Sequence, residues 1–190
     1  MNTQQMKKLT KLMAIAVAAL AIFFTTNAKA QTVDKSAWRL GIGVEGGLPT
    51  GDAHITSSFE LGGTARLQYG IDKNVAVMLT SGYYNFFGKN YTSIDATGTT
   101  VTTTTVKAPN AGIIPVKAGA KIFFDSPIYV SGEAGAGFST NSGGTTQLIL
   151  SPGLGWANHS WDIGVRYENF SGGGSNSGLV ALRLAYGFTL

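Results

Sequence analysis

The sequence has no cysteine and only two histidines among its 190 residues. The absence of cysteine excludes disulfide bonds and lipoprotein processing, so the fold must be held together by other means. It also excludes a thiolate metal site, and His54 and His159 are too far apart in the sequence to indicate a histidine site. The sequence therefore predicts neither a metal nor a cofactor.

Long apolar runs are also lacking, apart from one near the N-terminus. Residues 12–24 are uncharged and mostly apolar, they follow Lys7, Lys8 and Lys11, and Ala28-Lys29-Ala30 has the form of a cleavage site. This arrangement is typical of a secretory signal peptide, and the apolar run is short for a membrane-spanning helix. We expect residues 1–30 to be a cleaved signal peptide and residues 31–190 to form one mature domain. A retained membrane anchor is the alternative.

The mature chain would have no excess of charge of either sign. Four of the fourteen basic residues lie in residues 1–30 and none of the ten acidic residues does, which leaves ten of each. The basic pI of the whole chain therefore reflects the signal peptide. Without a basic patch, we do not expect the protein to bind nucleic acid.

What the sequence does have is glycine and a hydrophobic period of two. All 26 glycines follow residue 30, which gives the mature domain roughly twice the average glycine usage. Large apolar residues recur at every second position in eight segments, as in strands with one apolar face, and no segment has a convincing helical pattern. The eight segments are residues 38–48, 59–70, 75–87, 112–124, 128–138, 146–156, 161–170 and 179–190.

The lengths of these segments and of their connections indicate a membrane barrel. Each segment has ten to thirteen residues, close to the length that a tilted strand needs to cross a bilayer and about twice the usual globular strand. The first, third, fifth and seventh connections are longer than those between them, as in barrels with short periplasmic turns and longer outer loops. We predict an all-β fold, an eight-stranded antiparallel up-and-down transmembrane β-barrel.

The two faces of the segments differ in kind. One face is apolar without interruption, whereas the other carries charged residues and many glycines. The narrow interior of an eight-stranded barrel requires small residues, and a surface facing water does not. The apolar face should therefore meet lipid, although the faces of residues 75–87 are too mixed to assign. The predicted interior charges are Arg39, Glu45, Glu60, Arg66, Lys117, Lys121, Glu133, Asp162, Arg166, Glu168 and Arg183.

Buried charges persist only when they are paired. We therefore expect these side chains to plug the lumen with ion pairs and hydrogen bonds rather than to line an open pore. Separate solvated surface charges are the alternative.

Large aromatic residues gather at the segment ends, which indicates girdles at two membrane interfaces. The predicted girdle residues are Trp38, Tyr69, Phe124, Trp156, Trp161 and Tyr186 near the short turns, and Phe59, Phe87, Phe138 and Phe170 near the long loops.

The connection at residues 88–111 contains eight threonines. Because threonine favours strands, this loop is expected to extend as a hairpin, either as a partner surface or as a solvated shield.

The stretches WRLGIGVEGGLPTGD, GIIPVKAGAKIFF, WDIGVRYE and LVALRLAYGFTL resemble outer-membrane β-barrel proteins of the Bacteroidota, the porin-family or OmpA/OmpX-like barrels. The resemblance covers the mature chain in its pattern and glycine-rich phrasing, and includes no catalytic motif. It implies the outer membrane of a Gram-negative bacterium, contact with its lipid, and insertion by the barrel-assembly machinery, which reads a C-terminal strand signal. Tyr186, Phe188 and Leu190 would form that signal, although the family usually ends in an aromatic residue.

A structural or surface-interaction role follows, and no enzyme activity is predicted. His54 lies near Asp52 and Ser57 in a loop, which is weak support for catalysis, and no G-x-S-x-G motif is present. Three alternatives stay open. They are a narrow channel for small solutes, a membrane-embedded lipid-modifying enzyme, and a soluble periplasmic barrel that binds a ligand.

Overall fold

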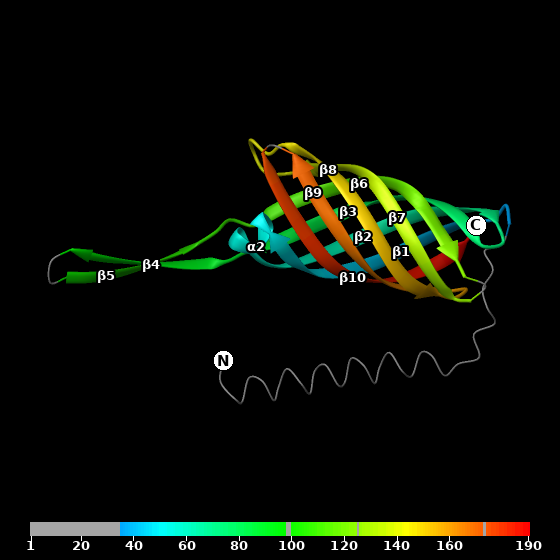
Figure 1. The fold of residues 1–190 in the computed structure, drawn as a ribbon, viewed down its shortest axis with the longest axis horizontal. Coiled ribbons are helices and arrows are strands. Elements are labelled where there is room, and N and C mark those ends of the chain that lie inside the picture. Colours follow the sequence, from blue (N-terminus) through cyan, green and yellow to red (C-terminus); the bar gives the residue numbers. More distant parts are fainter. Residues whose placement is uncertain (1–34, 98–99, 125, 173) are drawn as a thin grey trace, which may run out of the picture. The chain divides into compact units, whose positions relative to one another are not determined.

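The computed structural model describes residues 35–190 except residues 98, 99, 125 and 173. Eight strands of this part of the chain form a closed barrel, which confirms the predicted eight-stranded antiparallel fold (Figure 1). The predicted signal peptide lies outside the described residues. The barrel strands are β1 (Trp38–Gly51), β2 (Ser57–Asp72), β3 (Val75–Gly88), β6 (Ala111–Phe123), β7 (Ile128–Ser139), β8 (Thr146–Ala157), β9 (Trp161–Gly172) and β10 (Ser175–Thr189).

The strands follow one another around the barrel in chain order, and β10 closes it against β1. The closing pair runs antiparallel from Arg39 opposite Thr189 to Gly51 opposite Ser177. The backbone N–H of Leu190 extends this seam by donating to the Trp38 carbonyl oxygen at 2.9 Å. Closure leaves no open strand edge in the barrel, a condition that a lipid environment imposes.

The two ends of the barrel differ. At one end, here named the turn end, lie Trp38, Leu190 and the short turns β2–β3, β6–β7 and β8–β9. At the other, named the loop end, the short helix α2 (Asp52–Thr56) joins β1 to β2. Among the described residues, no helix is long and apolar enough to cross a membrane.

The threonine-rich connection forms the predicted hairpin at the loop end. Its strands β4 (Asn90–Thr97) and β5 (Thr100–Lys107) pair only with each other within the described chain. The hairpin base is bonded to the end of α2, because Lys89 N–H donates to the Thr56 carbonyl oxygen at 2.8 Å and the Tyr91 hydroxyl donates to that of Ile55. The hairpin and α2 therefore form one structure at the loop end.

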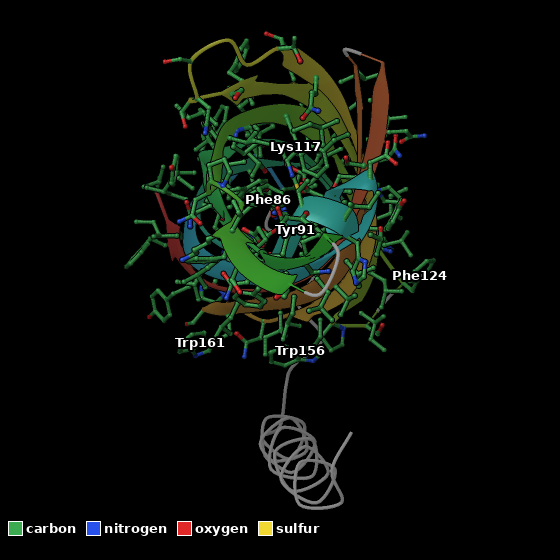
Figure 2. All side chains as sticks on the ribbon, turned by 90° about the vertical axis from the view of Figure 1, so that its left-hand side faces the viewer. Phe86, Tyr91, Lys117, Phe124, Trp156 and Trp161 are labelled. Atoms are coloured by element: carbon green, nitrogen blue, oxygen red, sulfur yellow. The ribbon has the colours of Figure 1, made fainter. Side chains whose placement is uncertain are left out.

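Side chains alternate between the lumen and the outer surface as the period of two predicts. Ile42, Val44 and Leu182 are among the many apolar side chains exposed on the outside. Figure 2 shows Lys117 and Phe86 inside the ring of strands, and Phe124 outside it. The apolar face is thus the outer face.

The structure also orients β3, which the pattern left unassigned. Ala76, Met78, Thr80, Tyr84 and Phe86 are buried and point into the lumen. The alternate positions face outward and include exposed apolar and aromatic residues, namely Val77, Leu79, Tyr83 and Phe87. The strand has a mixed pattern because it also carries apolar residues on its inward face, near both ends of the barrel.

One of the ten predicted girdle residues faces the lumen, and another faces outward but is covered by its neighbours. Phe170 is only 2 % exposed, because it shares its parity on β9 with the inward-facing Arg166 and Glu168. Trp156 has outward parity but is buried, since its cross-strand neighbours Ile128 and Ile163 flank it on both sides. The other girdle positions are exposed or half-buried on the outer face at the two ends of the barrel.

Candidate functional site in the barrel lumen

The middle of the lumen is filled by one connected network of charged side chains. Nine of the eleven predicted residues take part in it, from β1, β2, β6, β7, β9 and β10. Their side chains are at most 11 % exposed. The nine are Glu45, Arg66, Lys117, Lys121, Glu133, Asp162, Arg166, Glu168 and Arg183.

Arg166 is the centre of the half of the network that lies nearer the loop end. Its guanidinium group pairs with Glu45, with Glu168 at 2.9 Å and with Glu133 at 3.7 Å. Lys117 also pairs with Glu168, and both side chains are fully buried. Removing Arg166 would leave carboxylates uncompensated, which is costly in a low-dielectric interior.

Asp162 is the centre of the half nearer the turn end. Its carboxylate lies 2.6 Å from Lys121 Nζ, 3.6 Å from Arg66 Nη1 and 3.8 Å from Arg183 Nη1. The Tyr129 hydroxyl donates to the same carboxylate at 2.6 Å. Arg66 joins the two halves, because its Nη2 also lies 2.9 Å from Glu133.

Hydroxyl groups bring the remaining two strands into the network. From β3, Thr80 accepts from Arg66 Nε at 3.0 Å and donates to Glu133, and Tyr84 accepts from Arg166 Nη2 at 2.7 Å. From β8, Ser151 donates to Glu168 at 3.1 Å. Every barrel strand is therefore tied to the others across the lumen as well as through its neighbours.

Glycine makes room for one of these tyrosines. A Cβ placed on Gly155 or Gly164 would lie 2.5 Å or 2.6 Å from the Tyr129 hydroxyl oxygen. The ring of Tyr129 can lie along the inner wall over β8 and β9 because these two positions carry no side chain. The sequence indicated small interior residues but did not indicate that a particular ring depends on them.

Two predicted members of the network have no ion pair among the described residues. Glu60 is 0 % exposed, yet neither of its carboxylate oxygens has a hydrogen-bond partner. Arg39 lies at the turn end beside Arg66, Asp162 and Arg183, and its Nη2 is buried without a partner. The numbers of cationic and anionic side chains are therefore nearly equal over the whole lumen, but they are unequal at each of its ends.

An apolar layer lies between the network and the loop end, and the sequence did not predict it. Tyr84 and Phe86 from β3 contact Ile149, Phe170 and Leu179 from β8, β9 and β10. The rings of Phe86 and Phe170 meet edge to face, with centroids 6.0 Å apart. All five residues are at most 5 % exposed, so this layer closes the lumen above the charged network.

The loop end above this layer is hollow. A cavity of about 400 Å³ is floored by Phe86, Ile113 and Phe170 and rimmed by hydroxyl and amide side chains such as Ser177 and Gln147. Asp52 from α2 also lines it and accepts from the Asn176 backbone N–H at 3.1 Å. This cavity is large enough for a small organic ligand.

The histidines do not form a common site. His54 is exposed in α2 at the loop end, and the segment that holds His159 is the β8–β9 turn at the turn end. The length of the barrel lies between them, so they cannot act on one substrate. Asp52, two residues before His54, already accepts a hydrogen bond from the Asn176 backbone N–H.

Comparison with known proteins identifies the fold but no family. No family model and no curated protein matches the sequence. Crystal structures of Ail, the attachment invasion locus protein of Yersinia pestis, and of the N-terminal β-barrel domain of Pseudomonas aeruginosa OprF match with TM-scores of 0.54 and 0.51. The identities are 17 % and 13 %, over 81 % of this chain and 99 % and 98 % of theirs. A structure of Ail in a phospholipid bilayer nanodisc matches at 0.53, with 17 % identity over 81 % of this chain and 100 % of that chain.

Proposed function

We propose that the protein is a small barrel of the outer membrane of a Gram-negative bacterium, with a closed lumen and a structural or surface-interaction role. The observation that carries this proposal is the complete burial of Lys117 and Glu168 in mid-lumen. Side chains that line a water-filled pore would be exposed. The apolar layer above them supplies a second barrier.

The outer face supports the membrane location. Its exposed side chains are largely aliphatic around the middle of the barrel, and aromatic residues such as Trp38, Phe124, Phe59 and Phe138 are exposed near the two ends. Such a belt between aromatic girdles is suited to a bilayer. The likeness to Ail in a bilayer nanodisc is consistent with this location.

The loop end is proposed to face the outside of the cell. Short turns of outer-membrane barrels face the periplasm and long loops face outward. The loop end then presents the β4–β5 hairpin, α2 and the cavity of about 400 Å³. A surface partner or small ligand would meet these elements first, and no catalytic function is proposed for them.

Three large residues are exposed at the turn end of β10. Tyr186 and Phe188 alternate on its outer face, and Leu190 directly follows the strand. We propose that they form the strand signal read by the barrel-assembly machinery, as in the Bacteroidota barrels that the sequence resembles. Phe188→Ser should lower the amount of folded barrel in cells several-fold, while purified protein refolds into detergent as well as the wild type. Equal amounts in cells would contradict this role.

Fractionation of cells that express the full chain tests the proposed function. The protein should sediment with the outer membrane, resist extraction by salt, and migrate differently on gels before and after boiling. A tag inserted between β4 and β5 should be reached by protease in intact cells. Release by salt with identical mobility before and after boiling would overturn the membrane proposal, and a protected tag would overturn the orientation.

A further inference from the structure

Positive charge is in excess at the turn end of the lumen. Arg39, Arg66, Lys121 and Arg183 gather there around the single carboxylate of Asp162. Glu133 is the nearest further anion paired with this group, and it is shared between Arg66 and Arg166. The local carboxylates therefore do not neutralise the local cations.

Two of these guanidinium groups carry donors without acceptors. Arg39 Nη2 and Arg183 Nη2 are both buried and have no hydrogen-bond partner. Arg183 is only 3 % exposed, and its Nε already donates to Thr64 at 2.9 Å. A buried charged donor without an acceptor is unfavourable. An acceptor bound between Arg39 Nη2 and Arg183 Nη2 would remove this cost.

Both arginines line the same small cavity. Its volume is about 10 Å³, and Gly41, Gly187 and Asp162 also line it. This volume corresponds to roughly one water-sized group. Sulfate and phosphate are too large to enter without rearrangement of the walls.

Two glycines of the closing seam shape the cavity. Gly41 on β1 lies directly opposite Gly187 on β10. A Cβ on Gly187 would lie 2.1 Å from Arg39 Nε, and a Cβ on Gly41 would lie 3.8 Å from Arg183 Nη2. The absence of a side chain at Gly187 lets the Arg39 side chain cross the seam toward Arg183.

We propose that this cavity binds one small inorganic anion of halide size between Arg39 and Arg183. The two unpartnered atoms at this cavity, Arg39 Nη2 and Arg183 Nη2, are both donors of positively charged groups. Three guanidinium groups line the cavity, whereas only one carboxylate does. That carboxylate is already occupied by Lys121 and by the Tyr129 hydroxyl. A water molecule would accept hydrogen bonds but would leave the excess charge uncompensated.

An anion at this position would stabilise the closure of the barrel. Arg39 belongs to β1 and Arg183 to β10, the two strands that meet at the seam. The ion would bind the folded barrel and not the unfolded chain, so it shifts the folding equilibrium by mass action. Folded stability should therefore depend on the identity of the anion as well as on ionic strength.

Crystals of the full-length protein grown with sodium bromide test the site directly. The expected result is an anomalous difference peak within hydrogen-bond distance of Arg39 Nη2 and Arg183 Nη2. Density for a water molecule without anomalous signal, or bromide only on the outer surface, would overturn the proposal.

Thermal unfolding in a nonionic detergent gives the solution test. Folded protein is compared in sodium chloride, sodium bromide and sodium gluconate at equal ionic strength, because gluconate is too large for the cavity. Halide at several times its dissociation constant should raise the Tm by about 2 to 4 °C over gluconate. Equal Tm values in the three salts would overturn the proposal.

Arg39→Gln is the informative variant, because Arg39 has no ion pair among the described residues and its replacement should allow folding. The halide-specific rise in Tm should disappear in this variant. The matched control is Lys107→Gln, which removes one exposed positive charge from β5 and should keep the full rise. A rise that persists in Arg39→Gln would contradict the site.

A measurement on the wild type alone covers the case in which Arg39→Gln does not fold. The ³⁵Cl line of sodium chloride should show excess width in the presence of folded protein, and added bromide should reduce that width by competition. A line width equal to that of the detergent blank would overturn the proposal.

Discussion

The two ends of the lumen are built on different principles, although the same strands form both. Toward the loop end the interior is apolar, with Phe86, Ile149 and Phe170 beneath an open cavity. Toward the turn end cations are in excess around Asp162, and only a small apolar cluster of Phe123, Tyr129 and Ala157 packs beside them. The comparison shows that a narrow barrel can be closed by packing at one level and by ion pairs at another.

The unpartnered groups at the two ends have opposite charge. Glu60 carries a buried carboxylate without a hydrogen-bond partner beside Gly47 and Gly62, and Leu179 of the apolar layer also lies against Gly47. Arg39 and Arg183 carry unpartnered donors at the turn end. Glu60 cannot pair with Arg39 or Arg183, because the charged network around Arg166 and Glu168 lies between the two ends of the lumen.

The largest effect is expected at the centre of the charged network. Arg166→Met removes the partner of Glu45 and leaves three buried carboxylates with less compensation. The free energy of unfolding should fall by about 3 to 5 kcal/mol, measured by urea titration of the refolded protein in detergent. Lys107→Met, which alters an exposed cation in the hairpin, should change it by less than about 0.5 kcal/mol.

A double variant sharpens this prediction. Lys117→Met combined with Glu168→Gln removes opposite charges from one buried pair, so it should cost less than Lys117→Met alone. If the double variant is as unstable as the sum of its single variants, the two side chains are not coupled as the network requires.

The apolar layer should respond almost as strongly as the network. Phe170→Ala opens a cavity in a packed interior and should cost about 3 to 4 kcal/mol. The control is Phe87→Ala, which removes a ring of the same size from the outer face and should cost clearly less. Equal losses in the same urea titration would mean that the loop-end layer is not a packed core.

The outer face should show an effect that depends on depth. Leu182 lies on the outer face near the middle of β10, and Leu48 lies on the outer face near the loop end of β1. Leu182→Arg should cost roughly 2 to 4 kcal/mol in lipid vesicles, whereas Leu48→Arg should cost at most about 1 kcal/mol. Similar costs at the two positions would place the bilayer elsewhere on the barrel.

The smallest effect has the opposite sign. Glu60→Gln replaces an unpartnered buried carboxylate with a neutral amide of similar shape, so stability at neutral pH should rise by about 1 kcal/mol. Glu45→Gln should lower stability, because Glu45 is paired with Arg166. If both variants shift the urea midpoint in the same direction, Glu60 has a compensating partner in solution.

The period of two was sufficient to predict the barrel, its outer face and the inward direction of its charges. It was not sufficient for β3, where Tyr84 and Phe86 point inward, or for Phe170, which was placed in a girdle by its position near a strand end. An apolar residue has the same pattern whether it faces lipid or the interior of a barrel. Parity within the strand would have placed Phe170 correctly, since Arg166 and Glu168 share it.

Which charges meet could not be read from the sequence. Arg166 and Glu45 are 121 residues apart, and their contact depends on strand tilt and on the register of β1 against β10. The isolation of Glu60 and the excess of cations near Arg39 depend on the same register. Parity predicts which side chains enter the lumen, whereas the closed geometry decides their partners.

Conductance of the folded protein in planar lipid bilayers tests the closed lumen most directly. Insertion is verified by the shift in gel mobility on heating of the same preparation, and an open porin added afterwards serves as the control for the bilayer. The structure predicts no conductance steps above the baseline for the wild type. Stable, reproducible steps from the wild-type barrel would contradict a lumen sealed by Lys117, Glu168 and the apolar layer above them.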